Sequence, residues 1–163
     1  MVMMQPRLDY QKAAPEALKA MAGLERYIRT SSRLEPSLLE LLKTRASQIN
    51  GCAYCIDMHT KDARAAGETE QRLYGLNAWR EAPFYTERER AALEWTEALT
   101  LITEGHVPDD VFARARQHFS EEELVNLALA VVTINGWNRL AIAFRAEAGS
   151  YQPQSRQTRT ASQ

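Results

Sequence analysis

The stretch LLELLKTRASQINGCAYCIDMHTKDARAAGE, residues 38–68, decides how the chain is interpreted, because it holds both cysteines of the sequence. Apolar residues recur through it at the three-to-four spacing of amphipathic helices. Gly51 interrupts that spacing, and Gly67 stands in the position that commonly follows a helix. The pattern predicts one helix from about Pro36 to Gln48 and a second over Cys52 to Ala66.

Three reactive side chains share one face of the second predicted helix. At about 100° per residue, Cys52, Cys55 and His59 fall within roughly 60° of one another. Cys52 lies at the start of the helix, where free amides and the helix dipole favour a thiolate, and the imidazole of His59 can accept a proton. The spacing therefore predicts a nucleophilic sulfur centre, and it is also compatible with a redox couple or a metal clamp.

Glu40 is a candidate fourth member of this site. It lies twelve residues before Cys52, on the preceding predicted helix. If the turn QING folds the two helices side by side, the carboxylate can reach and orient the ring of His59, as a third group does in nucleophile and base systems. The alternative is a surface interaction of Glu40 with Lys43 or Thr44.

The rest of the chain is predicted to be all-α. With 163 residues it is the size of one domain, and its seven glycines and six prolines separate segments of helical periodicity. We expect a single helical-bundle domain over residues 1–149, and a flexible polar tail over residues 150–163. Outside the central stretch, the predicted elements are a helix over Pro15–Arg29, a short helix over Thr69–Asn77, helix starts at the capping boxes Thr86/Glu89 and Ser120/Glu123, and a strongly apolar helix over Leu124–Asn135.

Composition argues against several classes of partner. The formal net charge is −1 with 25% charged residues, which gives no basis for a nucleic-acid or membrane-surface partner. The opening MVMMQPRLDYQK lacks the apolar core of a signal peptide, and the apolar run over residues 124–135 is too short for a bilayer. We therefore expect a cytoplasmic protein, a compartment in which a close cysteine pair is more often catalytic or metal-binding than a structural disulfide.

A zinc site is the main chemical alternative. Cys52, Cys55, His59 and Glu40 would supply four ligands, but three ligands on one helix at this spacing match no common zinc pattern, so we expect no metal. The other two histidines, His106 and His118, have no cysteine partner in sequence and are interpreted as structural. The tryptophans are interpreted as core or interface residues; they are Trp79, Trp95 and Trp137.

The central stretch resembles the core of the alkylhydroperoxidase D and carboxymuconolactone decarboxylase superfamily, whose peroxidase branch carries Glu-x11-Cys-x2-Cys-x3-His. Glu40, Cys52, Cys55 and His59 match this pattern without a gap. The resemblance implies an all-helical domain that assembles into trimers or hexamers and needs no cofactor. The decarboxylase branch lacks the redox pair, so the intact pair argues against a lactone decarboxylase.

The resemblance also implies a role for each residue. Cys55 would be the peroxidatic cysteine and Cys52 the resolving one, with His59 and Glu40 as the proton relay. The best-known peroxidase members carry a histidine directly before the second cysteine, where this chain has Tyr54, which we expect to be auxiliary. A phenol can donate a hydrogen bond, but near pH 7 it does not shuttle protons as imidazole does.

Two functional hypotheses follow from the sequence. The first is a cysteine-dependent alkyl hydroperoxide reductase or thiol-disulfide oxidoreductase in antioxidant defence. Its partners would be a hydroperoxide substrate and a dithiol reductant, either a lipoyl-bearing protein or a small thiol. The second is a redox-sensing or structural helical homo-oligomer with little turnover.

Overall fold

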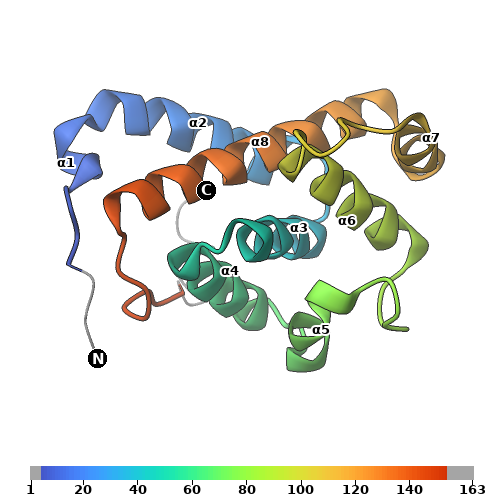
Figure 1. Cartoon of the computed structure of the whole chain (residues 1–163), viewed down its shortest axis with the longest axis horizontal. Coiled ribbons are helices and arrows are strands. Elements are labelled where there is room, and N and C mark those ends of the chain that lie inside the picture. Colours follow the sequence, from blue (N-terminus) through green and yellow to red (C-terminus); the bar gives the residue numbers. More distant parts are fainter. Residues whose placement is uncertain (1–4, 154–163) are drawn as a thin grey trace.

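The computed structural model describes residues 5–153, which contain helices and no strand, so the predicted all-α fold is confirmed (Figure 1). The elements in chain order are α1 (Tyr10–Ala13), α2 (Pro15–Ser31), α3 (Pro36–Asn50), α4 (Ala53–Ala65), α5 (Glu70–Tyr74), the 3₁₀ turn η1 (Leu76–Ala78), α6 (Glu87–Thr100), α7 (Asp109–His118) and α8 (Glu121–Phe144).

Helix α3 lies at the centre of the bundle. It packs against α4, α6 and α8, and Figure 1 shows it between α8 and α4. Its buried residues occupy more than one side of the helix, as expected for an element that is covered by several neighbours. This position matters for function because α3 carries Glu40 and leads directly into the cysteine helix α4.

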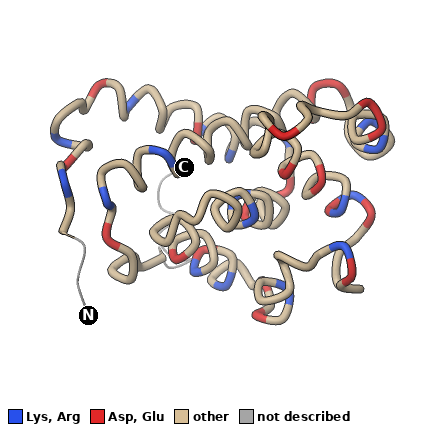
Figure 2. The backbone as a smooth tube through the Cα atoms, in the orientation of Figure 1, with Lys and Arg blue, Asp and Glu red and all other residues tan. Residues whose placement is uncertain are grey.

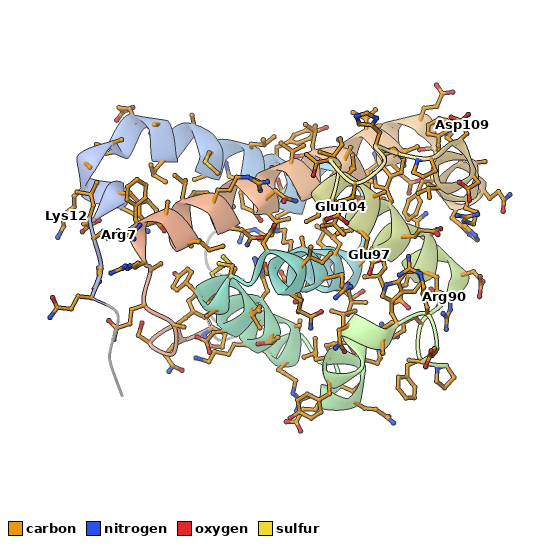
Figure 3. All side chains as sticks on the ribbon, in the orientation of Figure 1. Arg7, Lys12, Arg90, Glu97, Glu104 and Asp109 are labelled. Carbon is orange, nitrogen blue, oxygen red and sulfur yellow. The ribbon has the colours of Figure 1, made fainter. Side chains whose placement is uncertain are left out.

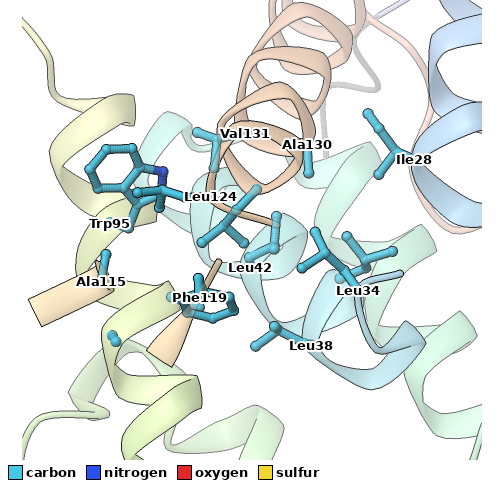
Figure 4. Packing of buried hydrophobic residues seen from close by; sticks show 14 of the residues in the cluster. Ile28, Leu34, Leu38, Leu42, Trp95, Ala115, Phe119, Leu124, Ala130 and Val131 are labelled. Carbon is cyan, nitrogen blue, oxygen red and sulfur yellow. The ribbon is translucent and has the colours of Figure 1, made fainter. Parts of the chain in front are cut away.

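The main hydrophobic core is built between α2, α3, α6, α7 and α8. Figure 4 shows Leu38 and Leu42 of α3 packed in the same cluster as Trp95 of α6, Phe119 and Val131. A separate small cluster surrounds the two cysteines, formed with Ala46, Ile134 and Ala141. The thiols therefore lie in an apolar region that is distinct from the main core.

Both predicted capping boxes are present. The Thr86 hydroxyl accepts from the backbone N–H of Glu89, and the Glu89 carboxylate accepts from the backbone N–H of Thr86. Ser120 and Glu123 form the same reciprocal pair at the start of α8. These local contacts satisfy amides that the first helical turn leaves free, which explains why sequence alone located both helix starts.

The loop before α6 is held by arginine side chains. Arg90 donates to the backbone carbonyls of Trp79 at 2.9 Å and of Tyr85 at 3.2 Å. Glu97 lies seven residues further along α6, and Figure 3 labels it together with Arg90. Its carboxylate accepts from Nε of Arg45 and from the indole N–H of Trp79, each at 2.8 Å. These hydrogen bonds hold the irregular loop between η1 and α6 against the bundle.

Helix α8 extends beyond its predicted apolar run in both directions. The fifteen residues between Glu123 and Arg139 carry no charge, a gap that can be followed along α8 in Figure 2. One face is buried in the bundle, but Val125 and Val132 are 61% and 59% exposed. By length and mean hydropathy α8 could cross a membrane, although core helices of soluble proteins pass the same test and α8 packs on α2, α3 and α6.

Three features of the chain differ from the sequence predictions. The short helix α1 was not expected, and the predicted helix over Thr69–Asn77 is divided into α5 and η1. Residues 150–153, expected to begin the flexible tail, lie against α4, where the Tyr151 hydroxyl donates to Asp62 at 2.8 Å. The rest of the predicted tail, residues 154–163, lies outside the described residues.

Candidate active site

The turn between α3 and α4 places Cys52 at the N-cap of α4. Gly51 adopts φ 68°, a left-handed conformation that glycine accepts without steric cost, and its N–H donates to the carbonyl of Gln48. The chain then reverses, so that α4 packs along α3. The Cys52 sulfur accepts a hydrogen bond from the backbone N–H of Cys55 at 3.4 Å.

The two cysteines are free thiols, and each is only 1% exposed. They differ in whether they line a cavity. Cys55 lines a cavity of about 280 Å³, together with His59 and Glu40, whereas Cys52 is not part of its wall. A small molecule in this cavity would therefore meet the sulfur of Cys55.

The electrostatics of the pair favour a thiolate on Cys52. The hydrogen bond with the Cys55 side chain lowers the pKa of Cys52 to about 7, against the opposing effect of burial; first-turn amides and Asn138 contribute further. The hydrogen bond with Cys52 and burial raise the pKa of Cys55 well above the usual range of a thiol. As the pH rises above about 7, these shifts favour a pair that keeps one proton, on Cys55.

Glu40 and His59 form the predicted contact. Oε2 of Glu40 lies 2.9 Å from Nδ1 of His59, and both side chains are largely buried. An ionised carboxylate can only accept, so Nδ1 of the histidine carries the hydrogen and Nε2 is left for other partners. This geometry is the orienting arrangement expected from the sequence.

Lys43, the neighbour considered as an alternative partner, has another role. It is buried and forms an ion pair with Glu25 of α2 at the wall of the same cavity. Burying an ammonium group is costly unless it is paired, so this contact fixes α2 against α3 beside the site.

A buried amide network supports the cysteines from α8. Asn138 is fully buried; its Nδ2 donates to the hydroxyl of Ser47 at 3.0 Å and its Oδ1 accepts from Nδ2 of Asn50 at 2.8 Å. Ser47 and Asn50 belong to the last turn of α3, which leads into Cys52. Asn138 also acts to lower the pKa of both thiols, so it connects α8 to the reactive pair.

Comparisons with known proteins identify the family of the chain. Residues 15–98, which include all four matched positions, fit the Carboxymuconolactone decarboxylase family. The chain belongs to this family. It is 50% identical over 147 residues to the uncharacterised protein YdfG of Bacillus subtilis, a match that covers 90% of this chain and 99% of the relative.

Solved structures place the chain in the alkylhydroperoxidase D-like part of the family. A protein of unknown function from Agrobacterium tumefaciens, for which an AhpD-type role in antioxidant defence has been suggested, is 48% identical, with a TM-score of 0.86 over 90% of this chain and 100% of that one. The debrominase Bmp8 shares the fold at 21% identity, with a TM-score of 0.74 over 86% of this chain and 75% of that one. The family match and the Agrobacterium structure support a peroxidase-like function in coarse terms, whereas Bmp8 shows the shared fold alone.

Aromatic side chains complete the cavity of this family member. Tyr54, the predicted auxiliary residue, lines it beside Cys55. Sequence reasoning missed three others, Tyr10, Trp137 and Tyr151, which come from α1, α8 and the segment after α8. Burial and the hydrogen bond to Asp62 raise the pKa of Tyr151 to about 12, so its hydroxyl stays protonated at neutral pH.

The remaining site expectations concern histidines, tryptophans and metal. His106 lies in the turn after α6, His118 lies in the last turn of α7, and neither lines the cavity. Trp79 and Trp95 are buried as expected, whereas Trp137 faces the cavity. Within residues 5–153 no three His, Cys, Asp or Glu side chains are grouped to hold a metal ion.

Proposed function

We propose that this protein is a thiol-dependent peroxidase that reduces an organic hydroperoxide with its cysteine pair. The observation that carries the proposal is the presence of Cys55, His59 and Glu40 in the wall of one cavity, with Cys52 hydrogen-bonded behind Cys55. This arrangement offers a peroxide one accessible sulfur, one oriented imidazole and one second thiol.

In the first step the Cys55 thiolate attacks the outer peroxide oxygen. The S–O bond forms as the O–O bond breaks, which leaves a sulfenic acid on Cys55 and an alkoxide. His59, held through Nδ1 by Glu40, takes up at Nε2 the proton lost when one thiol of the pair ionises, and it passes this proton to the alkoxide, which leaves as an alcohol. Sulfur is oxidised and the peroxide is reduced in this step.

The pKa difference within the pair fits this step when the shared proton moves. The thiolate first forms on Cys52, and Cys55 donates its hydrogen bond to it. Transfer of that proton from Cys55 to Cys52 places the charge on the sulfur that faces the cavity. Access to the cavity therefore favours Cys55 as the attacking residue. Because the negative charge is more stable on Cys52, moving it to Cys55 costs free energy.

In the second step Cys52 resolves the sulfenic acid. Its sulfur attacks the sulfur of Cys55, a disulfide forms, and water leaves. A dithiol, on a lipoyl group or a small molecule, then reduces the disulfide by exchange through a mixed disulfide. No organic cofactor takes part in this cycle.

Turnover separates this function from a redox sensor. With the whole chain, a hydroperoxide and an excess of a recycling dithiol such as dihydrolipoamide, we expect many equivalents of peroxide to be consumed per chain. Consumption of a single equivalent, followed by a stable disulfide, would replace the peroxidase by a sensing module. Cys55→Ser measured in parallel shows how much of the consumption comes from the dithiol alone.

A further inference from the structure

Aromatic and apolar side chains supply about half of the residues that line the Cys55 cavity, and polar or charged side chains supply the rest. Tyr54 of α4, Trp137 of α8, Tyr10 of α1 and Tyr151 contribute rings, and Met58 contributes a thioether. The redox chemistry described above needs none of these rings. Their shared feature is flat, polarisable surface, which favours planar ligands through stacked and edge-to-face contacts.

The ends of the described chain hold two of these rings in place. Tyr10 stacks on Phe144 with ring centroids 5.5 Å apart, and the backbone N–H of Arg7 donates to the Phe144 carbonyl at 3.0 Å. Figure 3 shows Arg7 beside the end of α8, where its guanidinium also donates to Ala143. The N-terminal wall is therefore anchored to the helix that supplies Trp137.

The segment after α8 contributes another part of the wall and turns back toward α4 (Figure 1). The backbone N–H of Gly149 donates to Asp57 at 3.0 Å, and the carbonyl of Tyr151 accepts from Lys61 at 3.0 Å. The Tyr151 hydroxyl donates to Asp62. Three residues of the cysteine helix thus fix the position of this ring.

Charged groups in the wall are engaged with one another. Lys43 is paired with Glu25, Glu40 with His59, and Asp62 with the hydroxyl of Tyr151. The further charged residue of the lining, Arg29, is exposed. The interior accordingly presents aromatic faces to a ligand rather than unpaired charge.

The volume limits the size of the ligand. About 280 Å³ lies at the small end of ligand sites, which span roughly 300–1,000 Å³. One aromatic ring with a short branched substituent fits such a space, whereas an extended acyl chain would have to leave it. The part of such a chain that lies outside the cavity would gain no contact with the aromatic side chains of the lining.

We propose that this cavity takes a compact arylalkyl hydroperoxide, in which the carbon that bears the peroxide is attached to an aromatic ring and this ring lies among Tyr10, Tyr54 and Trp137. The inference rests on the proposed peroxidase function and uses the same step. The Cys55 sulfur takes the outer oxygen, the O–O bond breaks, and the aryl-bearing alkoxide leaves as an alcohol with the proton relayed by His59. Cysteine is oxidised, the aryl hydroperoxide is reduced, and the dithiol closes the cycle.

The test compares substrates that differ in shape. With dihydrolipoamide as reductant, kcat/KM is measured for cumene hydroperoxide, tert-butyl hydroperoxide and a linear octadecadienoic acid hydroperoxide. We expect the cumene compound to exceed the tert-butyl compound by about tenfold, the size of one favourable ring contact. The linear hydroperoxide should be slower than the cumene compound. Equal values for the three peroxides, or preference for the linear one, would overturn the inference and leave the peroxidase proposal intact.

Variants test whether the preference for cumene hydroperoxide depends on residues of this cavity. Trp137→Leu and Tyr10→Ala should each reduce the ratio of the cumene to the tert-butyl rate toward one. Tyr10 belongs to the short helix α1, so the second change removes a ring of the cavity without altering α8. The matched control is Tyr74→Ala, because Tyr74 is 76% exposed on α5 and outside the cavity, and the ratio should not change. An unchanged ratio in both cavity variants would contradict the proposal.

Binding of the product separates this inference from the peroxidase proposal. Calorimetry should detect binding of 2-phenylpropan-2-ol, the alcohol formed from cumene hydroperoxide, that is stronger than binding of tert-butanol and is weakened by Tyr10→Ala. If no peroxide is consumed, the proposed function fails while this measurement still decides the ligand class. Equal binding of the two alcohols, or binding of neither, would reject the aryl site.

Discussion

Nδ1 of His59 lies 2.9 Å from a carboxylate oxygen of Glu40, although the two residues are nineteen positions apart and belong to different helices. The contact exists because the left-handed Gly51 reverses the chain between α3 and α4. It fixes the tautomer of the histidine and directs Nε2 away from the carboxylate.

Removing either member of this pair should slow the first reaction with peroxide. His59→Ala should lower its second-order rate constant by about 10²–10⁴, because a positioned proton relay is lost. Glu40→Gln keeps the shape but not the charge, and it should cost about 10- to 100-fold, as loss of a histidine's carboxylate partner does elsewhere. Stopped-flow measurement of thiol oxidation checks both values. A larger loss for Glu40→Gln than for His59→Ala would show that the carboxylate acts by another route.

Much of this arrangement could be predicted from sequence because it is local. The periodicity of α4 puts Cys52, Cys55 and His59 on one face, and the capping boxes at Thr86 and Ser120 are contacts between residues three apart. Only the Glu40 contact required an assumption about tertiary structure, namely that a short turn folds two helices together.

The residues that sequence reasoning missed come from distant parts of the chain. Asn138 meets Asn50 across 88 positions, and Tyr151 meets Asp62 across 89. Trp137 belongs to an uncharged run whose pattern predicts only burial. No local signal distinguishes an aromatic residue in the core from one that lines a cavity, because both satisfy the same apolar pattern.

One thiol of the reduced protein should ionise near neutral pH. The hydrogen bond from Cys55 lowers the pKa of Cys52 to about 7, so the thiolate population rises as the pH increases through 7. Cys55 has a raised pKa and should remain protonated well above that range. Thiolate absorbance near 240 nm should therefore increase by one group per chain around pH 7. Two groups titrating together near pH 8.5, the ordinary value, would contradict the hydrogen-bonded pair.

Asn138→Ala should raise the pKa of Cys52, because it removes a hydrogen bond that adds to the larger contribution from Cys55. The matched control is Asn126→Ala on the same helix. Asn126 is also buried, and it bonds Ser32 and Tyr27, far from the thiols. Both variants should lose about 1–3 kcal/mol of unfolding free energy. Only Asn138→Ala should move the thiolate titration, and an equal shift in both would make the network purely structural.

The protein should assemble into a homo-oligomer, a trimer or a hexamer. Val125 and Val132 lie seven residues apart on α8, on the same side of the helix, and both are largely exposed. Sedimentation equilibrium at micromolar concentration should give a multiple of the 18.5 kDa chain mass. Val125→Lys with Val132→Lys should weaken the assembly, whereas Tyr74→Lys on α5 should not. A monomeric mass for the unchanged chain would contradict the expectation.

The roles of the two cysteines are tested most directly by trapping the sulfenic acid in single-cysteine variants. One equivalent of hydroperoxide is added to Cys52→Ser and to Cys55→Ser, followed by a dimedone-type reagent and intact mass analysis. We expect Cys52→Ser to react once and to keep a trappable sulfenic acid, since only the resolving thiol is missing, and we expect Cys55→Ser not to react. The reverse order, with Cys55→Ser trapped and Cys52→Ser inert, would show that the low pKa of Cys52 outweighs the access of Cys55 to the cavity.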